Sequence, residues 1–213
     1  MLSYAILIDA GFAKRKIGSL QDPATSEKFQ CLVEKIKGSP ELSGHRLHRV
    51  YFYDAEPIDS IEKNPLSSEK VDFGKSPIVK RSTQLFRELA REPFFSLRLG
   101  ACSFNGWGVS KRLINKPKSS DPLEVTADDL VPLIMQKGVD MRIGIDIASL
   151  TLKNHVKIIV LVSGDSDFIP AMKFARREGA SVYLVNMRHP VKDGMYEHSD
   201  IVIDIDPSGF FCK

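Results

Sequence analysis

Four aspartates stand where the surrounding sequence would end a strand or begin a helix. Asp9 follows the apolar run "YAILI", Asp165 and Asp167 follow "IIVLVSG", and Asp140 opens the helical pattern "VDMRIGIDIASL". Carboxylates are ligands of hard cations such as Mg²⁺ and Mn²⁺, and such ions activate water for attack on phosphorus. No Walker loop, GxGxxG or HExxH motif accompanies them, and no Ser, Cys or His nucleophile is apparent. The acids therefore indicate metal-assisted attack of water on a phosphorus centre.

Each of these aspartates also has a structural interpretation. An aspartate at the start of a helix commonly caps it, and one beside small residues commonly forms a turn. Capping and metal binding are compatible, so the joint placement of the four acids favours the chemical interpretation. Asp146 lies six residues after Asp140, well round the helix from it, and is interpreted as structural or peripheral. A phosphatase of the haloacid-dehalogenase type would need an aspartate where Gly11 stands, and is set aside.

The elements that position these acids alternate along the chain. Hydrophobic patterns predict strands at 4–11, 45–57, 94–102, 156–164, 180–187 and 201–205. They predict helices at 25–38, 77–92, 139–154, 167–179 and 193–200. Residues 58–77 are expected to be a loop with at most a helical turn, and residues 103–122 a loop or a hairpin. Residues 125–136 stay ambiguous, because Thr126 and Asp129 suggest a helix start and Pro132 interrupts it.

This alternation predicts an α/β fold, a three-layer sandwich with a mostly parallel central sheet. We expect one domain over residues 1–213, with an irregular basic insertion around 103–122. In such sheets ligands bind beyond the carboxyl ends of the strands. If the strands that precede Asp9 and Asp165 are neighbours, those two carboxylates converge on one crevice, and Asp140 can face it from its helix.

Charge and composition narrow the class of protein. Residues 1–120 carry 20 Lys and Arg against 13 Asp and Glu, whereas residues 121–213 carry 10 against 14. A basic half suits a polyanion and an acidic half suits cations, although uneven surface charge explains the difference equally well. The three cysteines are widely spaced and form no CxxC pattern, and the first apolar run is too short to span a bilayer. We expect a cytoplasmic protein without a membrane segment.

Two basic segments are candidates for contact with nucleic acid. The first is Lys14, Arg15 and Lys16, directly after Phe12. The second is 107–118, which interleaves an aromatic side chain with cations at Trp107, Lys111, Arg112, Lys116 and Lys118. Basic groups beside aromatic rings suit single-stranded nucleic acid, which needs charge for its phosphates and flat faces for its bases. The alternative is that Trp107 is a packing residue and that the lysines are merely solvated.

Several stretches, in order, resemble one family. They are "ILIDAG", "VYFYDAEP", "QKGVDMRIGIDIASL", "VLVSGDSDFIPAMKFARREGASVYLV" and "HSDIVIDI". The chain resembles the NYN domains of the PIN-like nuclease superfamily, particularly the LabA-like proteins. The resemblance implies a PIN-like (Rossmann-like) α/β sandwich and a ribonuclease-type hydrolase site that uses Mg²⁺ or Mn²⁺. It implies Asp9, Asp140, Asp165 and Asp167 as catalytic, metal-binding acids, with Ser163 in support and Lys137 as a phosphate contact.

The chain departs from the family at its first motif. Asp-Gly-x-Asn is frequent there, and this sequence reads Asp9-Ala10-Gly11-Phe12, so the asparagine is absent or displaced. We therefore expect either of two functions. One is a Mg²⁺- or Mn²⁺-dependent endoribonuclease that acts on single-stranded RNA, with Asp165 or Asp140 as general base. The other is a weakly active or inactive regulatory module that binds RNA or protein. A monomer and a homodimer are both compatible with the sequence.

Overall fold

The computed structural model describes residues 1–115 and 124–210. Within them two compact units are formed. The first unit comprises Met1–Asp54, Leu85–Gly100 and Gly138–Lys213, and the second comprises Ala55–Gln84 and Ala101–Lys137. The expectation of a single domain over residues 1–213 stays a prediction.

The strands follow the expected alternation, and their order is β6-β5-β2-β1-β7-β8-β9 in the main sheet, with β3 and β4 forming a separate hairpin. β1 pairs in parallel with β2 and β7, β7 with β8, and β8 with β9, so the sheet is mostly parallel. The predicted α/β class is therefore confirmed. The bounds of the strands are β1 Ser3–Asp9, β2 Arg46–Glu56, β3 Ile61–Lys63, β4 Lys70–Asp72, β5 Phe95–Val109, β6 Leu130–Lys137, β7 Ile158–Val162, β8 Ser181–Val185 and β9 Ile201–Val202.

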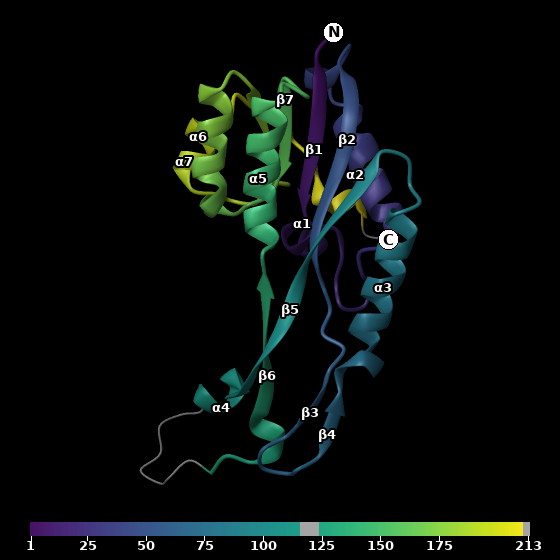
Figure 1. Ribbon diagram of the computed structural model, residues 1–213, viewed down its shortest axis with the longest axis vertical. Helices are drawn as coiled ribbons and strands as arrows, with labels where there is room; N and C mark the ends of the chain where they lie inside the picture. Colours follow the sequence, from purple (N-terminus) through teal and green to yellow (C-terminus); the bar gives the residue numbers. More distant parts are fainter. Residues whose placement is uncertain (116–123, 211–213) are drawn as a thin grey trace. The chain divides into compact units, whose positions relative to one another are not determined.

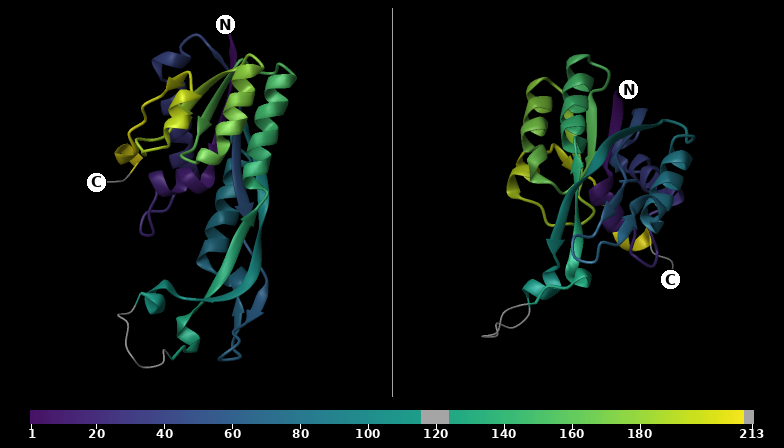
Figure 2. Two further views of the ribbon diagram at one scale, coloured as in Figure 1. Left: turned by 90° about the vertical axis from the view of Figure 1, so that its left-hand side faces the viewer. Right: turned by 60° about the horizontal axis from the view of Figure 1, so that its bottom comes forward.

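Helices connect these strands and cover the sheet of the first unit on both faces. Figures 1 and 2 show α5 and α6 on one side of β1, β2 and β7, with α2 on the other. The α-helices are α1 Ala10–Ile17, α2 Ser26–Lys37, α3 Pro77–Leu89, α4 Lys111–Ile114, α5 Val139–Leu152, α6 Ile169–Arg177 and α7 Asp193–Glu197. Short 3₁₀ helices are η1 Pro40–Leu42, η2 Phe73–Lys75, η3 Ala127–Asp129, η4 Ser166–Phe168 and η5 Pro207–Phe210.

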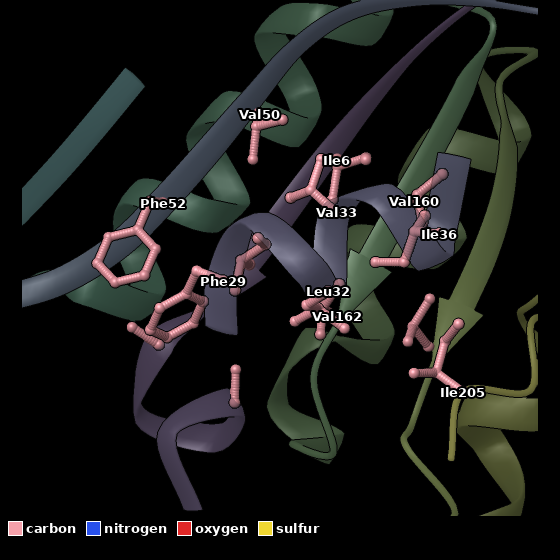
Figure 3. Packing of buried hydrophobic residues seen from close by; sticks show 14 of the residues in the cluster. Ile6, Phe29, Leu32, Val33, Ile36, Val50, Phe52, Val160, Val162 and Ile205 are labelled. Atoms are coloured by element: carbon pink, nitrogen blue, oxygen red, sulfur yellow. The ribbon is translucent and has the colours of Figure 1, made fainter. Parts of the chain in front are cut away.

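The alternation of side chains along each strand builds a core on both faces of this sheet. Ile6 and Ile8 of β1 belong to one buried cluster, which includes the apolar stripe of α2. Figure 3 shows the rings of Phe29 and Phe52 close together in this cluster, and their planes meet edge to face at 88°. The neighbouring residue of β1, Leu7, is fully buried and points to the opposite face, because successive side chains of a strand alternate. Burial on both faces explains why the core strands are continuous apolar runs.

Two segments differ from the sequence-based expectations: α1 in the first unit, which was not expected, and residues 58–77 in the second unit. Residues 58–77 contain the hairpin of β3 and β4, where irregular chain was expected. Residues 103–109 are the end of β5 and pair antiparallel with β6, which agrees with the hairpin alternative for the start of segment 103–122. The ambiguous segment 125–136 is a 3₁₀ turn followed by β6, not an α-helix. Pro132 is tolerated because β6 is at the edge of the sheet, where a missing N–H leaves no neighbouring strand without a donor.

No helix among residues 1–115 and 124–210 is long and apolar enough to cross a membrane.

Candidate functional site

Asp9 and the Ser163–Asp167 turn meet at the carboxyl edge of the first unit's sheet. β1 and β7 are parallel neighbours, and Ile8 is in register with Val162. Asp9 is the last residue of β1, and the turn follows directly after β7. The convergence expected from the sequence is therefore present, because parallel neighbours end at the same edge of a sheet.

One buried hydroxyl connects the two strand ends. Ser163 is fully buried, and its Oγ donates a hydrogen bond to Asp9 Oδ2 at 3.0 Å. The same Oγ accepts a hydrogen bond from the backbone N–H of Asp165 at 3.1 Å. Ser163 therefore orients the carboxylate at the end of β1 and the backbone that carries Asp165. Its supporting role at a metal site stays a prediction.

Asp9 and Asp165 both cap helices. Asp9 Oδ1 accepts from the N–H of Phe12 at 3.1 Å at the start of α1, and Asp165 Oδ1 accepts from the N–H of Asp167 at 2.9 Å at the start of η4. The structural interpretation is thus correct for both acids. Capping still leaves acceptor positions on each carboxylate for a cation, since a carboxylate has about four of them. The side chains of Asp165 and Asp167 are exposed beyond the turn.

Asp140 lies in the first turn of α5 and faces the acids after β7. The residue that caps α5 is Gly138, with φ of 78°, so Asp140 is not the cap that the sequence allowed. The pKa of Asp140 is raised above its usual value by partial burial and by the charges of Asp165 and Asp167. The carboxylate of Asp140 is therefore close enough to repel both of them.

The pKa of Asp9 is also raised, and burial of its carboxylate is the main cause. The hydrogen bonds from Phe12 and Ser163 and the charge of Arg15 oppose this shift, whereas the charge of Asp140 adds to it. Asp9, Asp140, Asp165 and Asp167 thus form one electrostatically coupled group, which we call the acidic edge. Carboxylates that raise one another's pKa in this way are stabilised by a cation between them.

The donor set of the acidic edge suits a hydrated hard cation. It consists of carboxylate and hydroxyl oxygens, without sulfur or imidazole. No three His, Cys, Asp or Glu side chains in the described part of the chain are grouped closely enough to enclose an ion by themselves. Mg²⁺ commonly keeps several waters and is bound by only one or two carboxylates, so the acidic edge fits such an ion rather than one held entirely by protein ligands.

A cavity of about 320 Å³ opens beside the acidic edge in the first unit. Asp9 and Asp165 contribute acidic groups to its lining, and Arg15 and Lys192 contribute basic ones. We call it the edge cavity. A space that carries both charges at once suits a ligand that is anionic and also binds a cation, as a phosphate does.

Gly164, Phe12 and His189 form the apolar and aromatic part of the edge cavity's lining. The rings of Phe12 and His189 lie 5.8 Å apart between centroids. A Cβ on Gly164 would lie 2.7 Å from Phe12 Cε2 and 2.8 Å from His189 Cδ2, so only glycine fits beneath the two rings. The glycine of the SGDSD turn therefore has a packing role that the sequence did not indicate.

The three cations after β1 have three different environments. Lys14 forms an ion pair with the buried carboxylate of Asp54 at the end of β2. Lys16 Nζ lies 3.2 Å from His189 Nδ1. Arg15 is exposed, lines the edge cavity and lowers the pKa of Asp9 by its charge. Of the three predicted nucleic-acid contacts, the structure thus brings Arg15 to the edge cavity, while Lys14 and Lys16 interact with protein groups.

The loop after β8 supplies His189. Met187 and Arg188 both have positive φ, of 49° and 56°, which is uncommon for residues other than glycine. Arg188 turns away into ion pairs with Asp204 and Asp206 at 2.8 and 2.9 Å. The pKa of His189 is lowered by burial and by the charges of Lys16 and Arg15, which keeps the imidazole neutral.

The remaining predicted residues belong to the second unit. Trp107 donates from Nε1 to the carbonyl of Lys63 at 3.0 Å and packs against Phe73 and Phe104, as a packing residue does. Lys111 and Arg112 are exposed on α4, and Lys137 is exposed at the end of β6. Lys116 and Lys118 lie outside the described residues.

Sequence reasoning missed two contributors to this region, Asp54 and Gly164. The first is contained in the "VYFYDAEP" stretch, whose aspartate is buried and ion-paired rather than part of a turn. The hydrogen bond between His189 and Lys16, 173 positions apart, also has no local signal. Asp146 is structural, as expected, because it accepts hydrogen bonds from Tyr53 Oη at 2.9 Å and Arg98 Nε at 3.0 Å.

Comparison with solved structures supports the fold. The chain is similar to a crystal structure of a protein of unknown function, VPA0982, from Vibrio parahaemolyticus, with a TM-score of 0.52 and 14% sequence identity. The match covers 96% of this chain and 93% of the other. At that identity the similarity concerns the fold alone. None of the curated proteins matches the chain significantly.

Comparison with protein families identifies the C-terminal part of the chain. Residues 113–205 match the NYN domain. This range includes Asp140, Ser163, Asp165 and Asp167, whereas Asp9 and β1 precede it. The resemblance drawn from the five sequence stretches is confirmed over this range, and with its seven-stranded, mostly parallel sheet the fold is consistent with it. Residues 113–205 carry an NYN domain, a domain of the PIN-like nuclease superfamily.

Proposed function

We propose that the protein is an endoribonuclease that hydrolyses phosphodiester bonds of single-stranded RNA with the help of Mg²⁺ or Mn²⁺. The observation that carries this proposal is the acidic edge, where acids from β1, α5 and the turn after β7 act on one another. The NYN match supports a nuclease-like, RNA-related function, and PIN-like nuclease domains generally use divalent metals. The widely spaced cysteines suit the cytoplasm as its location.

Asp165 is the residue that would hold the ion directly, because its carboxylate is exposed at the acidic edge and its backbone is fixed by Ser163. Asp140 would face the ion through a water. Asp167 would bind the ion through water. The carboxylate of Asp9 would add to the negative potential that attracts the ion. When bound, the cation would supply an activated water and neutralise charge on the phosphate.

The chain's own residues would orient the attack. Ser163 and the N–H of Phe12 fix the carboxylate of Asp9, so this charge has one orientation. Asp140 is the better candidate for the general base, since partial burial and the charges of Asp165 and Asp167 make its carboxylate more basic. Arg15 would attract the anionic substrate to the same edge.

A regulatory module that binds RNA or protein without cleaving it is the second candidate. The observation in its favour is Phe12, whose buried ring stands where the family frequently has an asparagine. Under this function the acids would serve as helix caps only. Such a module would show no turnover with any metal, and its binding would survive the removal of the acids.

Cleavage of a labelled single-stranded RNA by the purified protein distinguishes the two. We expect cleavage with Mn²⁺ or Mg²⁺, and its loss with EDTA. Asp140→Asn and Asp165→Asn should each reduce the rate by about 100-fold or more, the scale of losing a catalytic charge or base. Glu178→Gln is the matched control, because Glu178 follows the far end of α6 and pairs only with Arg177 among the described residues. If both Asp variants cleave as fast as the parent, the assignment of the site is wrong.

A further inference from the structure

The lining of the edge cavity contains two cations, and the charge of one of them, Arg15, acts on Asp9 of the same lining. Arg15 and Lys192 both line the cavity, and neither makes an ion pair within residues 1–115 and 124–210. Two nearby cations do form ion pairs. Lys14 is paired with Asp54, and Arg188 is paired with Asp204 and Asp206. Among the cations near the acidic edge, Arg15 and Lys192 are therefore the ones that a ligand in the cavity can reach without breaking an ion pair among the described residues.

His189 adds a neutral donor to the same lining. The ammonium of Lys16 lies 3.2 Å from Nδ1, and because an ammonium can only donate, Nδ1 must accept. The ring proton is then on Nε2, which is available as a donor to a ligand. Phe12 and His189 are packed against Gly164 with no space for a Cβ, so the imidazole has little freedom to move.

The lining of the edge cavity also includes Asp9 and Asp165. A single free anion would be repelled by these carboxylates, and a free cation by Arg15 and Lys192. The backbone of a nucleic acid, which carries successive phosphates, suits both kinds of group, with one phosphate near the acidic edge through its metal ion and the next one near the cations. A volume of about 320 Å³ lies at the small end of ligand sites and suits one nucleotide unit rather than a duplex.

We propose that the edge cavity is a subsite for the phosphate next to the scissile one, with Arg15 and Lys192 as charged ligands and His189 as a neutral donor. This inference rests on the proposed function, because it takes the acidic edge as the place of cleavage. The phosphate can be an internal one of the RNA backbone or a terminal monoester, and both present the same oxygens.

Binding measured without turnover tests the subsite separately from cleavage. Fluorescence anisotropy with a labelled single-stranded RNA in EDTA reports affinity at several salt concentrations. Arg15→Gln and Lys192→Gln should each weaken binding about tenfold, the scale of one charge-assisted hydrogen bond. Each should also reduce the slope of log affinity against log salt by about 0.7, the value for one phosphate contact on a single strand.

Lys157→Gln is the matched control, since Lys157 is an exposed lysine just before the opposite end of β7. It should bind RNA like the parent. The proposal is overturned if Arg15→Gln and Lys192→Gln bind like the parent, if Lys157→Gln weakens binding equally, or if the parent does not bind.

Modified RNAs identify the phosphate. A neutral methylphosphonate is placed at each linkage in turn, and at one position it should abolish the difference between the parent and Arg15→Gln. If no linkage does so, a 5′-phosphate or 3′-phosphate must account for the difference, which then disappears with RNA that has hydroxyl ends. The proposal fails if neither change abolishes the difference.

The two proposals fail in different ways. If the parent does not cleave with Mn²⁺ and its binding still depends on Arg15 and Lys192, the subsite stands and the endoribonuclease function falls. If cleavage depends on Asp165 but neither cleavage nor binding depends on Arg15 and Lys192, the function stands and the subsite falls.

Discussion

Replacing Ser163 with alanine tests whether one hydroxyl holds the acidic edge together. The Ser163 Oγ is fully buried, donates to Asp9 Oδ2 and accepts from the N–H of Asp165. A hydrogen bond to a charged group contributes about 1.5–3 kcal/mol, and a partner left unsatisfied costs about 1–3 kcal/mol where water cannot reach it. Because Asp165 is exposed, its N–H can be solvated in part. We therefore expect Ser163→Ala to reduce the free energy of unfolding by about 2–3 kcal/mol.

The dependence of this loss on pH separates the hydrogen bond from a simple packing effect. The donor from Ser163 lowers the pKa of Asp9, against the larger effect of burial, so its removal raises the folded-state pKa of Asp9 further. A higher folded-state pKa means that stability is lost as the pH rises through it. The variant's deficit should therefore be larger at neutral pH than at a pH below the folded-state pKa of Asp9 in both proteins, where its carboxyl group is protonated.

Urea denaturation of Ser163→Ala at both pH values measures the effect. Ser199→Ala is the matched control, because the Ser199 hydroxyl donates to a backbone carbonyl in an exposed turn, and it should change the unfolding free energy by less than about 0.5 kcal/mol. A deficit for Ser163→Ala below about 0.5 kcal/mol would contradict the role assigned to this hydroxyl. An equal deficit at both pH values would show that Ser163 does not act through the charge of Asp9.

Three further substitutions have definite expected outcomes. Gly164→Ala places a methyl group against Phe12 and His189 and should reduce the unfolding free energy by about 1–3 kcal/mol, measured by thermal denaturation; an unchanged melting temperature would contradict the packing described. Asp140→Asn removes a carboxylate whose pKa is raised, so it should increase stability at neutral pH and have no effect below the unfolded-state pKa, as urea denaturation at both pH values can show. Tyr53→Phe removes the hydroxyl that donates to the carboxylate of Asp146 on α5, and it should reduce the unfolding free energy by about 1 kcal/mol in the same assay. An unchanged unfolding free energy would contradict that hydrogen bond.

The acids and the strands that carry them were predictable from the sequence. The runs before Asp9 and Asp165 are apolar at every position, which is typical of parallel strands buried on both faces. Parallel strands end at a common edge, so the approach of Asp9 to the turn after β7 followed from the strand assignments. The neighbour relation of the two strands was an assumption that the pairing of β1 with β7 confirms.

The second unit was not predictable in the same way. The end of β5 contains Gly106, with φ of 93°, and its register with β6 shifts between Phe104 and Trp107. A glycine and a register shift of this kind interrupt the alternation by which strands are recognised. Before β6, the helix-start pattern at Thr126 is present, but it begins only the 3₁₀ turn η3 and no α-helix.

The edge cavity could not be predicted either, because its parts come from distant positions. His189 is placed by two residues of positive φ and by Lys16, and neither has a pattern in a single sequence. The helix α1 was also not foreseen, since its eight residues follow β1 without any loop. Without that helix the directions of Lys14, Arg15 and Lys16 could not be distinguished.

In the short helix α1, the order of the three cations determines which group each of them contacts, and their number does not. Consecutive residues of a helix point about 100° apart, so three adjacent cations reach three different partners. Exchanging Arg15 with Lys14 would leave the composition and net charge of the chain unchanged. It would still put a lysine at the cavity and an arginine against Asp54. One residue inserted after Asp9 would rotate all three cations to the wrong neighbours, so in this segment the charge pattern is encoded by position along the helix and not by abundance.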